Sequence, residues 1–151
     1  MMKERLNYAT VSPEALKAMR ELEKYVAASG LERPLYELVK TRASQINRCA
    51  YCLDMHTKDA RKAGETEQRL YALSAWRETP FFTHRERAAL EWTEALTLIS
   101  ENDVPDSLYE EVCKHFDEKE MVALSIAIVA INGWNRLSIG FRTVPGSYKP
   151  L

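Results

Sequence analysis

Residues 35–64 read LYELVKTRASQINRCAYCLDMHTKDARKAG, and this stretch predicts two consecutive helices. Apolar residues recur at helical spacing from position 35 to position 46, so the first helix is expected to start near Pro34. The second is expected from about position 48 to position 63. Gly64 should end it, because glycine adopts the left-handed conformation at little cost. The segment therefore favours helix packed against helix.

The rest of the chain continues this helical pattern. Pro13 is a favourable first helical residue, since its missing N–H would be unpaired there anyway. Thr83 with Glu86, and Asp117 with Glu120, form capping boxes, in which each side chain accepts from the other's backbone N–H. Five further helices are expected, over about residues 13–30, 66–75, 83–100, 105–115 and 117–138, before an irregular tail over 141–151. We therefore predict an all-α bundle of about seven helices in a single domain, residues 1–151.

The composition of the 151 residues excludes several classes of protein. Hydrophobic residues make up 46%, and five glycines with six prolines are too few for the many turns of an all-β chain. The 21 basic and 22 acidic residues leave a formal charge of -1. A nucleic-acid partner is not expected, because its binding surface is usually strongly basic.

Export and membrane insertion are not expected either. The N-terminal MMKERLNYAT lacks an apolar stretch of signal-peptide length. The longest apolar run, Met121–Ile131, is interrupted by Ser125 and is shorter than the roughly 20 residues that span a bilayer. We therefore expect a cytoplasmic protein without a membrane partner. In that reducing compartment a close pair of cysteines is typical of catalysis or metal binding rather than of a structural staple.

A Cys-x-x-Cys-x-x-x-His pattern carries the chemistry. Cys49, Cys52 and His56 lie at i, i+3 and i+7, which share one face of a helix, and this face is expected to be the apolar one. If Asn47 caps the helix, the first turn and its dipole favour a thiolate at Cys49. The imidazole of His56, one turn after Cys52, instead favours a thiolate there. The pattern leaves open which cysteine reacts first.

Two cysteines at this spacing can close a disulfide with little backbone movement. With a peroxide, the first thiolate becomes a sulfenic acid, and the second thiol condenses with it to give a disulfide and water. One alternative is that the trio is simply buried core. Another is a zinc site, for which the remaining candidate ligands are His84, Cys113 and His115. These lie far along the chain with no second paired motif, so no metal is expected.

The region around the cysteines resembles the alkylhydroperoxidase D-like, or carboxymuconolactone decarboxylase, family. Its signature has a glutamate twelve residues before the first cysteine, and Glu37 stands at that distance from Cys49. The stretches 57–64, 132–137 and 144–148 also resemble the family. The resemblance implies an all-α fold in which the cysteine helix packs against its predecessor, and thiol-dependent reduction of hydroperoxides.

The resemblance also implies a role for each residue of the site. Cys52 would attack the peroxide and form the sulfenic acid, while Cys49 would donate a proton and then resolve it as a disulfide. Glu37 and His56 would form a proton relay, through water, that helps to ionise Cys52. On helical periodicity alone, however, Glu37 lies at the edge of the apolar stripe and is expected to be solvated.

The family further implies no bound cofactor, an external dithiol reductant such as a lipoyl group or a thioredoxin-like protein, and homo-oligomers, commonly trimers or hexamers. Tyr51 is a departure, because some peroxidase members carry histidine just before the second cysteine. A phenol can donate a hydrogen bond but cannot act as a base near neutral pH. Tyr51 is therefore a secondary candidate at the site.

Two other functions stay open. The same cysteine pair suits a disulfide-exchange or redox-sensing module without peroxidase turnover. A non-redox scaffold, held by structural zinc or by a plain helical interface, is the third possibility. Decarboxylation is disfavoured, because the lactone decarboxylases of the family generally lack the paired cysteines.

Overall fold

The computed structural model describes residues 2–150, and it confirms the all-α prediction. The elements are α1 (Tyr8–Val11), α2 (Pro13–Ala28), α3 (Arg33–Asn47), α4 (Ala50–Lys62), α5 (Glu67–Ala72), the 3₁₀ helix η1 (Leu73–Glu78), α6 (His84–Thr97), α7 (Asp106–Cys113) and α8 (Glu118–Phe141). No strand occurs within these described residues. The bundle thus holds eight α-helices over 2–150, one more than predicted, because the short α1 was missed. Met1 and Leu151, the ends of the predicted domain, lie outside the described residues.

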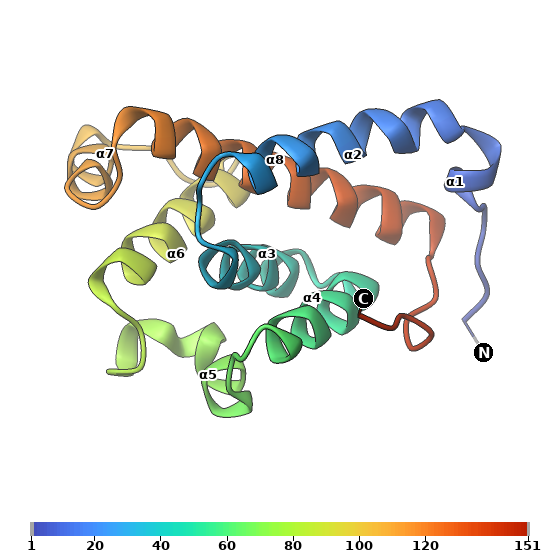
Figure 1. Cartoon of the computed structure of the whole chain (residues 1–151), viewed down its shortest axis with the longest axis horizontal. Helices are drawn as coiled ribbons and strands as arrows, with labels where there is room; N and C mark the ends of the chain where they lie inside the picture. Colours follow the sequence, from blue (N-terminus) through green and yellow to red (C-terminus); the bar gives the residue numbers. More distant parts are fainter. Residues whose placement is uncertain (1, 151) are drawn as a thin grey trace.

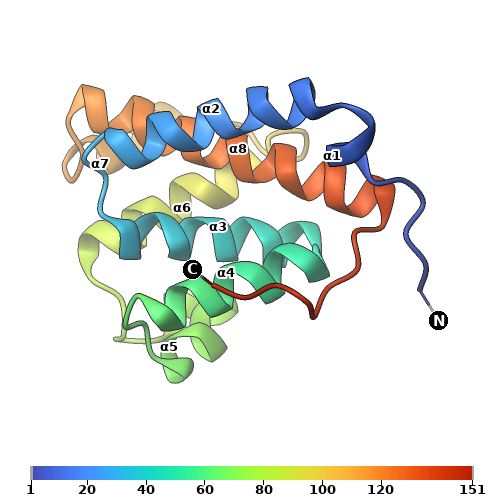
Figure 2. The ribbon, with the colours of Figure 1, turned by 45° about the vertical axis from the view of Figure 1, so that its right-hand side comes forward.

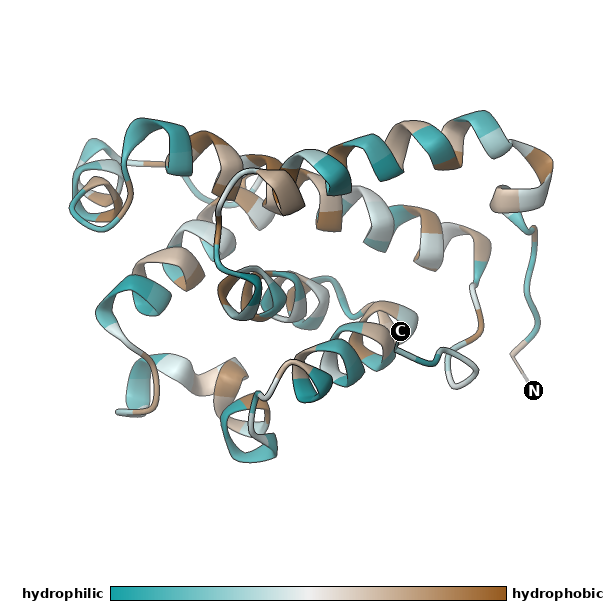
Figure 3. Cartoon of the chain, viewed as in Figure 1, coloured by the Kyte–Doolittle hydropathy of each residue, from teal (hydrophilic) through white to brown (hydrophobic). Residues whose placement is uncertain are grey.

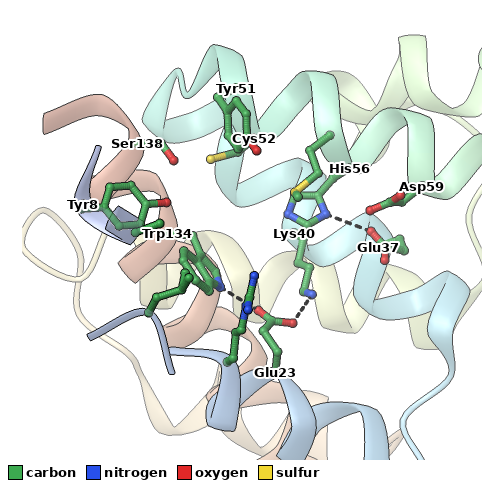
Figure 4. A pocket seen from close by; sticks show the side chains of 14 residues that line it. Tyr8, Glu23, Glu37, Lys40, Tyr51, Cys52, His56, Asp59, Trp134 and Ser138 are labelled. Atoms are coloured by element: carbon green, nitrogen blue, oxygen red, sulfur yellow. Dashed lines mark hydrogen bonds and ion pairs between the residues drawn. The ribbon is translucent and has the colours of Figure 1, made fainter. Parts of the chain in front are cut away.

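Helix α3 lies at the centre of the bundle and contacts α4, α6, α8 and η1. Helix α2 packs along the side of α8 that faces away from α3, as Figures 1 and 2 both show. Figure 3 shows polar and apolar residues alternating along α2, as expected of a helix with one face on the core and one in water. The chain after α8 turns back toward α4, so the C-terminal end of the fold lies beside the cysteine helix.

The core consists of three clusters that share α3. One joins α3 to α6, α7 and α8 and includes Trp92 and Phe116. Another lies among α3, α4, η1 and α6 and includes Leu73 and Trp76. The third contains both cysteines of α4 with Ile131 of α8. The cysteine face of α4 is therefore buried, as the helical spacing predicted.

Most predicted helix boundaries agree with the structure to within a few residues. Both capping boxes are present, at Thr83 with Glu86 and at Asp117 with Glu120. The region predicted as one helix over 66–75 is α5 followed by η1. The last helix continues to Phe141 before the irregular tail, rather than ending near 138.

The start of the cysteine helix differs from the prediction. Asn47 is the last residue of α3 and not a cap of α4, and Arg48 adopts the left-handed conformation with φ 58° and ψ 41°. Cys49 itself is the N-cap of α4. The sequence pattern missed this turn because a left-handed residue is usually glycine or asparagine, and here it is arginine.

Helix α8 is the one helix of residues 2–150 that is long and apolar enough to cross a bilayer by length and composition. It also supplies much of the buried core, including Leu124, Ile128 and Ile131. A core helix meets the same criteria as a membrane span, and the buried side chains of α8 belong to the core of the bundle.

A network of buried and half-buried amides joins α8 to the C-terminal end of α3. The Asn135 side chain is fully buried, and its Nδ2 donates to Ser44 Oγ at 3.0 Å. Its Oδ1 accepts from Asn47 Nδ2 at 2.8 Å, and Asn47 also donates to Asn132 Oδ1 at 2.9 Å. Because buried polar groups are costly when unpaired, this network fixes where α3 ends and where the turn to α4 begins.

Replacing Asn135 by alanine should lower the free energy of unfolding by about 1–3 kcal/mol, because the buried Ser44 and the half-buried Asn47 each lose a hydrogen bond. Urea denaturation followed by circular dichroism measures the change. Lys119→Ala, at an exposed position on the same helix, is the matched control and should stay within about 0.5 kcal/mol of the unaltered protein. An unchanged stability in Asn135→Ala would contradict the role of the network.

Candidate functional site

The left-handed turn at Arg48 places Cys49 at the N-cap of α4. Its Sγ accepts a hydrogen bond from the backbone N–H of Cys52 at 3.4 Å, as an N-cap side chain does. The dipole effect on Cys49 therefore arises from a capping position rather than from within the first turn. Both sulfurs lie at the positive end of α4, where negative charge is favoured.

Cys49 and Cys52 are joined as a disulfide, with their Cα atoms 5.3 Å apart. Both residues are almost completely buried, with exposed fractions of 1% and 3%. The structure thus brings together the two thiols that the Cys-x-x-Cys spacing paired. Cys113 on α7 stays a free thiol.

Glu37 of α3 lies against His56 of α4, with its Oε2 3.1 Å from Nδ1 of the imidazole. Both residues are buried, with exposed fractions of 4% and 7%. The expectation from periodicity that Glu37 is solvated is therefore wrong. Glu37 lies on the side of α3 that packs on α4, so the twelve-residue spacing from Cys49 predicted its place and the hydrophobic pattern did not.

A pocket of about 420 Å³ opens beside this pair. It is lined by Tyr8, Ala9, Leu16, Arg20, Glu23, Glu37, Lys40, Tyr51, Cys52, Met55, His56, Asp59, Trp134 and Ser138. Cys52 reaches the pocket, whereas Cys49 is not among its lining residues. With Nδ1 of His56 held by Glu37, Nε2 is the ring nitrogen left to exchange a proton in the pocket.

A second polar cluster forms the opposite wall of the pocket, and sequence reasoning missed it. Lys40 of α3 is buried and pairs with Glu23 of α2. Glu23 also accepts from the indole Nε1 of Trp134 at 3.1 Å. The buried ammonium is thus compensated by a carboxylate, as a buried charge requires. These residues come from three helices far apart in sequence, and no local pattern links them.

Tyr51, the predicted secondary candidate, also lines the pocket next to Cys52. Across the pocket lies Tyr8 of α1, whose pKa is raised by burial. A phenol with a raised pKa stays protonated near neutral pH and can donate a hydrogen bond. Two phenol groups thus line the same pocket as Cys52.

Within residues 2–150, the one group that could hold a metal ion comprises Glu37, His56 and Asp59, whose ligand atoms lie within 4.8 Å of one another. It contains no cysteine, so it does not match the zinc alternative built on Cys49 and Cys52. The other zinc candidates, His84 and His115, stack on each other with ring centroids 6.5 Å apart and lie in a different part of the fold.

Comparison with known proteins agrees with the fold. The model of the carboxymuconolactone decarboxylase family matches residues 13–95. The uncharacterized protein YdfG of Bacillus subtilis is 51% identical over 138 residues, which cover 91% of this chain and 94% of that protein.

Solved structures show the same fold. A protein of unknown function from Agrobacterium tumefaciens, for which identity as the antioxidant defence protein AhpD has been suggested, matches with a TM-score of 0.92 and 48% identity. That match covers 97% of this chain and 100% of the other. An uncharacterized peroxidase-related protein from Silicibacter sp. TM1040 has a TM-score of 0.80 at 22% identity, covering 90% of this chain and 72% of its own, which shows the fold alone.

The cysteine pairing predicts a specific thiol count. Protein oxidised in air and then denatured without reductant should react with one equivalent of iodoacetamide, at Cys113, because Cys49 and Cys52 are joined. After reduction, three thiols should react. Intact-mass spectrometry reads both numbers, and peptide mapping locates the labels. Three reactive thiols in the oxidised sample would contradict the pairing.

Proposed function

The chain belongs to the carboxymuconolactone decarboxylase family, and from that premise we propose that it is a thiol-dependent hydroperoxide reductase. The observation that carries the proposal is the position of Cys52, which faces a pocket beside the Glu37–His56 pair and has Cys49 directly behind it. The suggested antioxidant role of the Agrobacterium relative supports the same reaction.

The reaction begins with reduced cysteines. The Cys52 thiolate attacks the terminal oxygen of the hydroperoxide, the O–O bond breaks, and Cys52 becomes a sulfenic acid. The departing alkoxide takes one proton and leaves as the alcohol. The Cys49 thiol then displaces the hydroxyl of the sulfenic acid, which gives water and the Cys49–Cys52 disulfide. Two electrons pass from the thiol pair to the peroxide.

Glu37 and His56 move the protons for these steps. The imidazole takes the proton of Cys52, directly or through water, and the buried carboxylate stabilises the imidazolium that results. The same imidazolium then supplies the proton that the departing alkoxide needs. Glu37 orients the ring, because its contact at Nδ1 leaves Nε2 turned to the reacting groups.

An external dithiol completes the cycle, and no bound cofactor is required. Its thiolate attacks Cys52, since that is the sulfur in the pocket, and a second thiol of the donor then releases Cys52 while Cys49 regains its proton. Because Cys52 is only 3% exposed, a slender dithiol such as a lipoyl arm fits this route better than the surface of a thioredoxin-like protein. The apolar walls of the pocket, at Leu16, Met55 and Trp134, favour an organic hydroperoxide over hydrogen peroxide.

Disulfide exchange without peroxidase turnover is the competing function. Tyr51 favours it, because a phenol cannot replace the base that histidine provides at this position in some family peroxidases. Stopped-flow peroxide consumption, compared with insulin disulfide reduction by the same reduced protein, separates the two. Fast peroxide consumption with slow insulin reduction supports the peroxidase.

We further propose that the protein works in the cytoplasm as a homo-oligomer, a trimer or hexamer. Val122 and Val129 lie seven residues apart on α8, and each is 54% exposed. Apolar side chains on one exposed helix face are suited to packing against another copy of the chain. A cytoplasmic location would supply the reducing conditions that recycle the disulfide.

Substitution of each cysteine should give a different result. Cys52→Ser should abolish peroxide consumption, whereas Cys49→Ser should consume one equivalent and stop at a sulfenic acid that dimedone traps. Peroxide assays and mass spectrometry of the dimedone adduct measure these outcomes, with Cys113→Ser as the control that keeps full activity. Full turnover in Cys52→Ser would reverse the role assignment.

Removal of the imidazole should shift the reaction to higher pH. In His56→Ala the Cys52 thiol loses its proton acceptor, so the pH at which its peroxide reaction reaches half-maximal rate should rise by about one unit or more. Single-turnover rates of the reduced protein from pH 5 to pH 9 provide the profile. His84→Ala, outside the pocket, should reproduce the unaltered curve, and identical curves for both variants would remove His56 from the relay.

A further inference from the structure

The C-terminal tail lies on the cysteine helix. After α8 ends at Phe141, the chain runs back to α4, as Figures 1 and 2 both show. The backbone N–H of Gly146 donates to Asp54 Oδ2 at 3.0 Å, and Lys58 Nζ donates to the carbonyl of Tyr148 at 3.1 Å. The hydrogen bond from Lys58 also holds the pKa of Asp54 below its usual value, so Asp54 is an ionised acceptor at neutral pH.

A turn at Gly146 aims the next residues at α4. Its φ of 108° lies in the region that residues with a side chain rarely adopt. Two residues later, the phenol of Tyr148 reaches Asp59 on α4 and donates to its Oδ1 at 2.7 Å. Burial and the bond to Asp59 raise the pKa of Tyr148, so the phenol stays a protonated donor throughout the neutral range.

Asp59 in turn borders the Glu37–His56 pair. It lines the pocket, and ligand atoms of Asp59, Glu37 and His56 lie within 4.8 Å of one another. A negative charge within about 4–6 Å of an imidazole favours its protonated form. The Asp59 carboxylate therefore favours the proton on His56, which is the proton that the proposed relay exchanges with Cys52.

We propose that Tyr148 is a positioning residue of the site: through its hydrogen bond it holds Asp59 beside His56, and the carboxylate then favours the imidazolium that accompanies the Cys52 thiolate. This inference rests on the proposed function only in taking Cys52 as the reacting thiol. Tyr148 itself is not among the pocket-lining residues and acts through Asp59.

The sign of the effect follows from the charges. Without the phenol hydroxyl, Asp59 is free to turn toward solvent, and the imidazole loses one of two nearby negative charges. Its proton is then held less strongly, so the Cys52 thiol ionises at higher pH. The other charged or titratable groups that face the pocket are Tyr8 of α1, Arg20 and Glu23 of α2, Lys40 of α3 and Tyr51 of α4, and the substitutions below leave them in place.

The test is the pH dependence of Cys52 alkylation in the reduced protein. Iodoacetamide labelling from pH 5 to pH 9, with the label on Cys52 located by tandem mass spectrometry, gives the midpoint of thiol ionisation. Tyr148→Phe keeps the ring and removes the hydroxyl. Tyr71→Phe is the matched control, because Tyr71 is 71% exposed and its hydroxyl also donates to a glutamate, Glu67 Oε2 at 3.2 Å, away from the site.

Tyr148→Phe should raise the midpoint by about half a pH unit, which lowers the alkylation rate at neutral pH about threefold. Tyr71→Phe should not move it. Asp59→Asn should raise the midpoint at least as much, and the double variant should go no further than Asp59→Asn alone, since the two residues act in sequence. Thermal unfolding of each variant separates this effect from a loss of stability.

A Tyr148→Phe curve that coincides with the unaltered protein would overturn the proposal, and so would a change in thermal stability without a change in midpoint. Full additivity in the double variant would also overturn it. The assay contains no peroxide, so absence of peroxidase turnover would refute the proposed function while the midpoint still decides the role of Tyr148.

Discussion

The site depends on one buried contact, between the carboxylate of Glu37 and the imidazole of His56. Burying a carboxylate that is only 4% exposed is costly without a polar partner, and His56 is the partner that Glu37 contacts. The contact therefore fixes the relative register of α3 and α4. A shift of either helix by one residue would turn one of the two groups out of the contact. With that register, Cys52 faces the pocket and Cys49 lies behind it at the start of α4.

Much of this arrangement could be predicted from local pattern. Helical periodicity and capping boxes located most of the helices, and the spacing of Cys49, Cys52 and His56 predicted that they share a buried face. The buried position of Glu37 could not be predicted from local pattern. The hydrophobic pattern predicted exposure, because it records only how apolar the neighbours are, and the resemblance to a family supplied the correct position. When one specific partner offsets the cost of burying a polar residue, the sequence of its own helix does not reveal that the residue is buried.

The rest of the site could not be predicted, because it is assembled over long distances in the chain. The pocket takes residues from five helices, and its Lys40–Glu23–Trp134 cluster joins α2, α3 and α8. Tyr148 meets Asp59 across 89 positions of sequence. Such contacts depend on how the helices pack, and helical spacing describes one helix at a time. The turn at Arg48 was missed for a local reason, since arginine rarely adopts a left-handed conformation.

The shortness of the ring closed by Cys49 and Cys52, which are only three positions apart, has a thermodynamic consequence. A crosslink stabilises a fold mainly by reducing the freedom of the unfolded chain, and on the loop-entropy relation a ring this small contributes only about 2 kcal/mol, against about 4.7 kcal/mol for a ring of 100 residues. The helices around the disulfide are stabilised by the hydrophobic core. Opening this disulfide should therefore lower the free energy of unfolding by only about 2 kcal/mol, so the proposed reaction cycle would leave the fold intact in both the oxidised and the reduced protein.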